Sequence, residues 1–178
     1  WIDWIVMRIT DVFLSIPLLP LLLVLTAIVA ATSSKASLSF GVIVLIIGGL
    51  SWPGVARLVR ASFLSLRERE YTEAARALGN NDGRIIFRHL LPNAVAPIIV
   101  QATLAVASVI ITESTLSYLG FGIQPPTASW GNMLANAQAY FETAWWVAVL
   151  PGLCILITVL SINYIGDGLR DALDPNMR

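Results

Sequence analysis

The stretch YTEAARALGNNDGRIIFRHLLP, residues 71–92, decides how the chain is organised, because it is polar and partly basic and separates long apolar runs. Four of its residues recur at i, i+3, i+4 and i+7, the spacing of one helical face. They are Tyr71, Ala74, Ala75 and Leu78. Gly79 suits the left-handed residue that ends a helix, and we expect Asp82 to cap a second helix that Pro92 stops. A face made mostly of alanines lets a partner approach the backbone closely, so the stretch predicts a docking element.

Composition indicates a membrane protein. Hydrophobic residues make up 57% of the chain and charged residues 12%, with a mean hydropathy of +0.77, whereas soluble domains carry about 25% charged residues. Eleven basic and eleven acidic residues cancel, so net charge gives no indication of a nucleic-acid partner, and we expect none. The single cysteine, Cys154, lies in an apolar run, and the sequence has no metal or redox motif, so we expect no cofactor bound by this chain.

Four uncharged apolar runs have about the ~20 residues that a helix needs to cross a ~30 Å hydrocarbon core. They cover residues 12–31, 38–56, 93–112 and 143–166. Because helices and closed barrels alone satisfy their backbone in lipid, we predict an all-α, polytopic membrane bundle with four transmembrane helices. The sequence begins at Trp1 without an initiator Met, and we expect its N-terminal part to be missing.

The distribution of basic residues predicts which side each connection faces. With four spans, the N-terminal lead-in, the connection between the second and third spans and the C-terminal tail lie on one side. These segments carry ten arginines, whereas the opposite side carries only Lys35. By the positive-inside rule, the loop of residues 67–92 and the tail of residues 167–178 are cytoplasmic, and residues 113–142 form an outer loop.

The outer loop carries a further helix signal and an informative charge. Four residues that follow its two prolines recur at helical spacing: Trp130, Met133, Leu134 and Ala137. Glu113 lies just beyond the third predicted span, where a lipid-facing carboxylate is costly, so it should turn toward water, protein or a pathway. Two interpretations stay open for Glu113. It attracts a peptide amino terminus or a cation, or it is a helix-end residue hydrogen-bonded to the neighbouring loop.

Six positions of the central stretch match the cytoplasmic signature of ABC importer permeases, which reads E-A-A, three residues, G, nine residues, I, one residue, L-P. They are Glu73, Ala74, Ala75, Gly79, Leu91 and Pro92, while His89 stands where the pattern has Ile. The runs GFGIQPPTASWGNML and GDGLRDALDP resemble the dipeptide and oligopeptide branch of this family, which is often grouped with nickel importers. The chain therefore resembles a peptide-type importer permease over almost its whole length.

The resemblance implies that residues 71–79 form a coupling helix in a groove of an ATPase subunit. The coupling residues it implies are Tyr71, Glu73, Ala74, Ala75, Leu78, Gly79, Leu91 and Pro92. It further implies two cytoplasmic ATPase subunits that bind ATP and Mg²⁺, a second permease subunit, an extracytoplasmic substrate-binding protein, and a bacterial or archaeal inner membrane. In this reading, residues 1–178 are the last four spans of a longer permease. Candidate outer-loop contacts, with structural support as the alternative role, are Gln124, Pro125, Pro126 and Trp130.

No catalytic signature accompanies these features. The sequence has no G-x-x-x-x-G-K-[ST] loop, no H-E-x-x-H and no G-x-S-x-G elbow. We therefore expect a chain that is not an enzyme, and the resemblance implies a transport subunit that forms a path for di- or oligopeptides while its partners hydrolyse ATP. The alternatives are an ion- or proton-coupled secondary transporter that uses Glu113, a scaffold without transport, and an importer of nickel instead of peptides.

Overall fold

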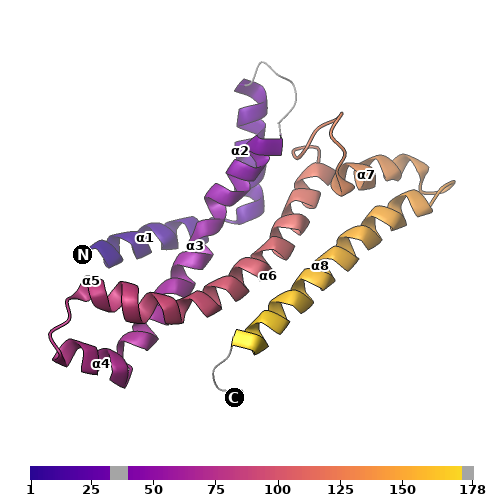
Figure 1. Cartoon of the computed structure of the whole chain (residues 1–178). Helices are drawn as coiled ribbons and strands as arrows, with labels where there is room; N and C mark the ends of the chain where they lie inside the picture. The colour runs from indigo at the N-terminus through magenta and orange to yellow at the C-terminus, as the bar shows by residue number, and fades with distance from the viewer. Residues whose placement is uncertain (33–39, 174–178) are drawn as a thin grey trace.

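The computed structural model describes residues 1–32 and 40–173, and every regular element in these ranges is a helix (Figure 1). The first three are α1 (Ile2–Ser15), α2 (Leu18–Thr32) and α3 (Phe40–Arg67). The central stretch forms α4 (Glu70–Ala77), α5 (Asp82–Ile85) and a π-helical turn, η1 (Ile86–Leu90). The remaining elements are α6 (Leu91–Tyr118), α7 (Trp130–Ala137), the 3₁₀ turn η2 (Gln138–Tyr140) and α8 (Trp146–Leu173). The predicted all-α class is confirmed.

Three of the described helical stretches are long and apolar enough to cross a membrane, and a bent pair makes four if it counts as one span. The three are α3, Asp82–Tyr118 and α8. The predicted spans at residues 93–112 and 143–166 fall largely inside the last two, and the one at 38–56 inside α3 apart from residues 38 and 39. Those two residues, the predicted turn at Lys35 and the tail beyond residue 173 lie outside the described residues. The observed helices are longer because their polar ends carry no hydropathy signal.

The predicted span at residues 12–31 is not one straight helix, because the chain bends by 86° between α1 and α2. Pro17 follows the end of α1, and Ile16 before it has the extended backbone (φ −90°, ψ 128°) that a following proline favours. Two ion pairs attach α1 to α3: Asp3 to Arg60 at 2.8 Å and Asp11 to Arg57 at 2.7 Å. The hydrogen bond from Arg60 lowers the pKa of Asp3 below its ordinary value. Charge pairing to a distant helix thus accompanies the bend.

The expectation that Pro92 stops a helix is wrong. Helical structure runs without interruption from Asp82 to Tyr118, and Pro92 lies in the first turn of α6. The π-helical turn η1 precedes it, so the hydrogen-bond register changes at the point where proline has no N–H to donate. The cap of this long helix is Asn81 and not Asp82, since the Asn81 side chain accepts a hydrogen bond from the Arg84 N–H at 2.8 Å.

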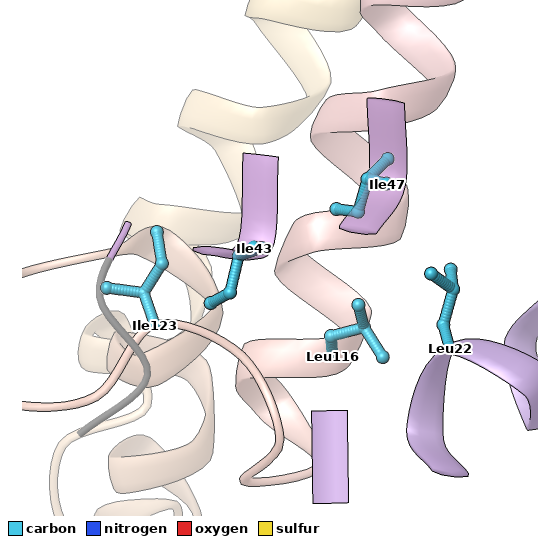
Figure 2. Packing of buried hydrophobic residues seen from close by; sticks show 5 residues of the cluster. All are labelled: Leu22, Ile43, Ile47, Leu116 and Ile123. Atoms are coloured by element: carbon cyan, nitrogen blue, oxygen red, sulfur yellow. The ribbon is translucent and has the colours of Figure 1, made fainter. Parts of the chain in front are cut away.

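Helix α6 is the central element, and it packs against α3, α7 and α8. One buried cluster joins α2, α3, α6 and the loop after α6 (Figure 2). It consists of Leu22, Ile43, Ile47, Leu116 and Ile123. Large apolar side chains of α8, including Leu156, Ile157 and Ile165, are exposed, as expected where lipid or other subunits are the solvent. Helices α4 and α7 lie at opposite ends of this arrangement (Figure 1).

Candidate functional site

The predicted helix at the start of the central stretch forms as α4, and Gly79 ends it as expected. Gly79 has a φ of +78°, and two backbone bonds close the helix: Gly79 N–H to Arg76 O at 2.9 Å and Asn80 N–H to Ala75 O at 3.3 Å. This pair is the Schellman arrangement, in which a left-handed residue satisfies the last carbonyls of a helix. The left-handed backbone at the end of α4 therefore explains why a glycine suits this position of the E-A-A signature.

The sequence placed Ala75 on one face with Tyr71, Ala74 and Leu78, but in the structure the Ala75 side chain is buried against its own chain. Ala75 is 5% exposed and packs with Ile85 and Leu90 against the partly buried Phe63 and Leu66. This second cluster lets α4 rest on the end of α3 and on the helix that follows. A short helix beside two others buries the side chains that face them, and helical spacing alone does not show which face that is.

Thr72 is a structural residue that the sequence did not reveal. It is fully buried, and its hydroxyl donates a hydrogen bond to the Leu66 carbonyl at 2.8 Å. This bond spans the break between α3 and α4 and fixes the angle at which α4 leaves α3. The sequence does not reveal this role, because a buried threonine in a polar stretch cannot be told from a solvent-exposed one by residue type or spacing.

Several of the remaining candidate coupling residues are exposed on one face of α4. Tyr71, Ala74 and Leu78 are exposed, with Leu78 at 83%, and they lie within about 60° of one another around the helix. Exposed side chains also belong to Glu73 and Pro92, whereas Leu91 and His89 are half-buried. An apolar face of this kind on a polar segment is available to a partner's groove.

At the other end of the bundle, Glu113 lies inside α6 and not beyond a helix end, because α6 continues to Tyr118. The Ser117 hydroxyl donates to Glu113 Oε1 at 2.6 Å, and the same hydroxyl oxygen accepts a hydrogen bond from the Ile123 N–H at 3.0 Å. Glu113 thus connects, through Ser117, to the loop after α6. Because Ser117 belongs to α6, this hydrogen bond to Glu113 stays within one helix, and both interpretations of Glu113 stay predictions.

The outer loop packs against α6 through glycines. A Cβ atom on Gly131 would overlap the Ser114 carbonyl oxygen, and one on Gly122 would overlap Ser117. The predicted helix after the prolines is confirmed as α7, which Ser129 caps by accepting a hydrogen bond from the Asn132 N–H at 3.2 Å. These contacts hold the start of α7 against α6, so the loop has a defined position.

The four candidate outer-loop contacts lie in three different environments. The Gln124 side chain donates to the Gly120 carbonyl at 2.8 Å, which is a role within the loop. Pro125 and Pro126 are exposed. Trp130, 36% exposed, begins α7 and contributes to the wall of a cavity.

That cavity has a volume of about 400 Å³ and lies between α3, α6, the loop and α7. Its wall is mostly apolar, with Ile43, Ile47 and Ile123 shared with the cluster of Figure 2. The polar side chains in the wall are Ser51 and Glu113. The structure thus brings Glu113 and Trp130 together, although they are far apart in the sequence, whereas the other outer-loop candidates stay outside the cavity wall.

Comparison with known proteins gives these features a context. Residues 1–178 match the family described as binding-protein-dependent transport system inner membrane component. Over the full chain, 43% of residues are identical to the dipeptide transport system permease protein DppC of Alkalihalophilus pseudofirmus, of which the chain covers 56%. Over 97% of the chain, 45% are identical to the di/tripeptide transport system permease protein DppC of Pseudomonas aeruginosa, of which it covers 55%.

A third relative is a putative peptide transport system permease protein of Brucella suis, with 42% identity over 99% of the chain and 57% of that protein. The chain therefore spans slightly more than half the length of these curated relatives. The long apolar helices of the structure and the family match over residues 1–178 both indicate a multi-pass membrane protein. The chain is a multi-pass membrane protein and belongs to the family of binding-protein-dependent transport system inner membrane components.

Proposed function

We propose that this chain is part of the permease subunit of an ATP-driven importer of di- or oligopeptides. The single observation that carries the proposal is α4, a short helix whose inner side is packed on its own chain while Tyr71, Ala74 and Leu78 stay open to a partner. The peptide substrate is supported by the printed names of the relatives, which are peptide transport permeases.

The packing of α4 suggests how force would pass from an ATPase to the membrane helices. The Thr72 hydroxyl bonds α4 to the end of α3, and Ala75 packs against Leu90 just before α6 begins. A displacement of α4 would therefore act on α3 and α6 together. In the proposed mechanism, ATP-driven closure of two ATPase subunits carries α4 inward, the spans switch from inward-facing to outward-facing, and hydrolysis resets them.

The distribution of charge supports the proposed orientation. Seven arginines lie between residues 57 and 88, around α4 and the cytoplasmic end proposed for α3. In this orientation α7 and its loop face a substrate-binding protein on the outer side, and a second permease completes the translocation path. ATP and Mg²⁺ bind to the partner ATPases, whose nucleotide is available only in the cytoplasm.

The proposal is tested with the full-length permease, its second permease, the ATPase subunits and the binding protein in proteoliposomes. Uptake of dialanine is expected to require ATP on the ATPase side and to continue when ionophores dissipate the ion gradients. Uptake that proceeds without ATP and collapses with the ionophores would instead establish gradient-driven transport. Accumulation of Ni²⁺ without dialanine would assign the other substrate class.

A further inference from the structure

We propose that the 400 Å³ cavity between α3, α6, the loop and α7 binds the protonated amino terminus of a peptide, with Glu113 as its counter-charge. This inference rests on the proposed peptide-import function and names a substrate contact for it. Of the two interpretations that the sequence left open for Glu113, it takes the one in which Glu113 attracts a peptide amino terminus.

The volume and wall of the cavity suit a small ligand. About 400 Å³ is within the range of small-molecule sites, which are mostly apolar with a few polar groups that orient the ligand. Here the wall holds the isoleucines of α3, the carboxylate of Glu113 and the indole of Trp130. An ammonium group is attracted by a carboxylate and can also lie against an aromatic ring, so a wall that contains Glu113 and Trp130 suits this chemical group.

The carboxylate has capacity left for a ligand. Ser117 occupies one acceptor position of Glu113 Oε1, while a carboxylate offers about four. Neither ion pair among the described residues involves Glu113. A carboxylate in a mostly apolar wall within a membrane helix is costly without a positive partner, and a ligand ammonium group would supply one.

A divalent metal fits the cavity poorly as an occupant. Nickel requires several nitrogen, oxygen or sulfur ligands in a defined geometry, and the wall offers one carboxylate and one serine hydroxyl. A monovalent organic cation requires only one counter-charge and a large contact area. The composition of the wall therefore favours an ammonium group over a divalent metal ion.

The test uses thiol protection on the detergent-solubilised full-length permease. The chain contains one cysteine, so Cys154→Ser together with Ser51→Cys puts a single reporter from this chain in the cavity wall, provided that other cysteines of the full chain are also replaced. Dialanine is expected to slow maleimide labelling of the reporter, and N-acetyl-dialanine is not. A reporter at Leu45, which is 76% exposed on α3 and outside the wall, should label at one rate in all conditions.

Two pairs of variants separate charge from shape. Glu113→Gln keeps an acceptor for Ser117 and should raise the dialanine concentration needed for protection about tenfold or more, whereas Glu142→Gln, an exposed carboxylate in the turn before α8, should not. Gly48→Leu should fill the cavity and abolish protection. Gly49→Leu is its matched control, because a Cβ at either glycine meets no atom within 4 Å and only Gly48 lines the wall.

Absence of protection by dialanine, equal protection by N-acetyl-dialanine, or unchanged protection in Glu113→Gln would overturn the proposal. The measurement needs neither ATP nor ATPase subunits. Failure of the cavity proposal is thus distinguishable from failure of ATP-driven import, which is measured by uptake in proteoliposomes.

Discussion

Ala74→Arg is expected to abolish stable binding of the ATPase subunits and ATP-coupled uptake, while the permease itself stays folded. Ala74 is exposed on α4 beside Tyr71 and Leu78, and arginine has nearly the helix propensity of alanine, so the helix should persist. A bulky charge on a small-residue face would keep a partner's groove from closing on the backbone. A loss of about 3 kcal/mol, roughly a hundredfold in affinity, is a reasonable magnitude for a central interface residue.

The measurement is co-purification of the ATPase subunits with the full-length permease, followed by dialanine uptake. Ala77→Arg is the matched control, since it introduces the same side chain at an exposed position about 60° around the same helix from Ala74 and about 100° from Leu78. It should retain most ATPase binding. Equal loss in both variants, or normal coupling in Ala74→Arg, would show that the face of Tyr71, Ala74 and Leu78 is not the docking surface.

The neighbouring alanine should behave differently, although both belong to the same E-A-A signature. Ala75 is packed in the cluster with Ile85 and Leu90, so Ala75→Arg would bury an unpaired charge within the permease itself. This variant should lower thermal stability and alter the elution profile before any partner is added. Loss of uptake in Ala75→Arg would therefore say little about docking, whereas loss in a stably folded Ala74→Arg would be specific to it.

Gly131→Ala is expected to detach the start of α7 from α6. The added Cβ would overlap the Ser114 carbonyl oxygen, which belongs to the backbone of α6 and cannot rotate away as a side chain could. Overpacking of this kind costs about 1–3 kcal/mol. Because Trp130 precedes this glycine and forms part of the cavity wall, the same substitution should also widen the cavity and weaken dialanine protection of the Ser51→Cys reporter.

Thermal unfolding and amide hydrogen exchange of the full-length permease check this expectation. Gly152→Ala in α8 is the control, because a Cβ there meets no atom within 4 Å and a helical alanine is favoured over glycine by up to about 1 kcal/mol. It should leave stability unchanged or raised. Unaltered exchange in residues 119–137 of Gly131→Ala would contradict the close packing of α7 on α6.

The outer end of the chain shows what depends on contacts distant in the sequence. The helical spacing of four residues after the prolines predicted a helix in residues 113–142, and α7 confirms it. That Glu113 and Trp130 line one cavity with Ser51 of α3 depends on the packing of three separate elements. Ser117, whose hydroxyl connects Glu113 to the loop, has no recognisable motif, because a serine acquires such a role only when the chain returns to it.

By itself, the sequence determined the all-α membrane class, the helix at residues 130–137, the glycine cap of α4 and the family, because hydropathy, helical period and motif spacing are local properties of the chain. The tertiary structure decided where the first predicted span bends, that Pro92 continues a helix, and which side of α4 stays open. Helical spacing defines a set of faces, but burial against Phe63, Leu66 and Leu90 selects among them, so Ala75 turns inward and Ala74 outward. Packing energy arises between elements, and no stretch of sequence taken alone contains it.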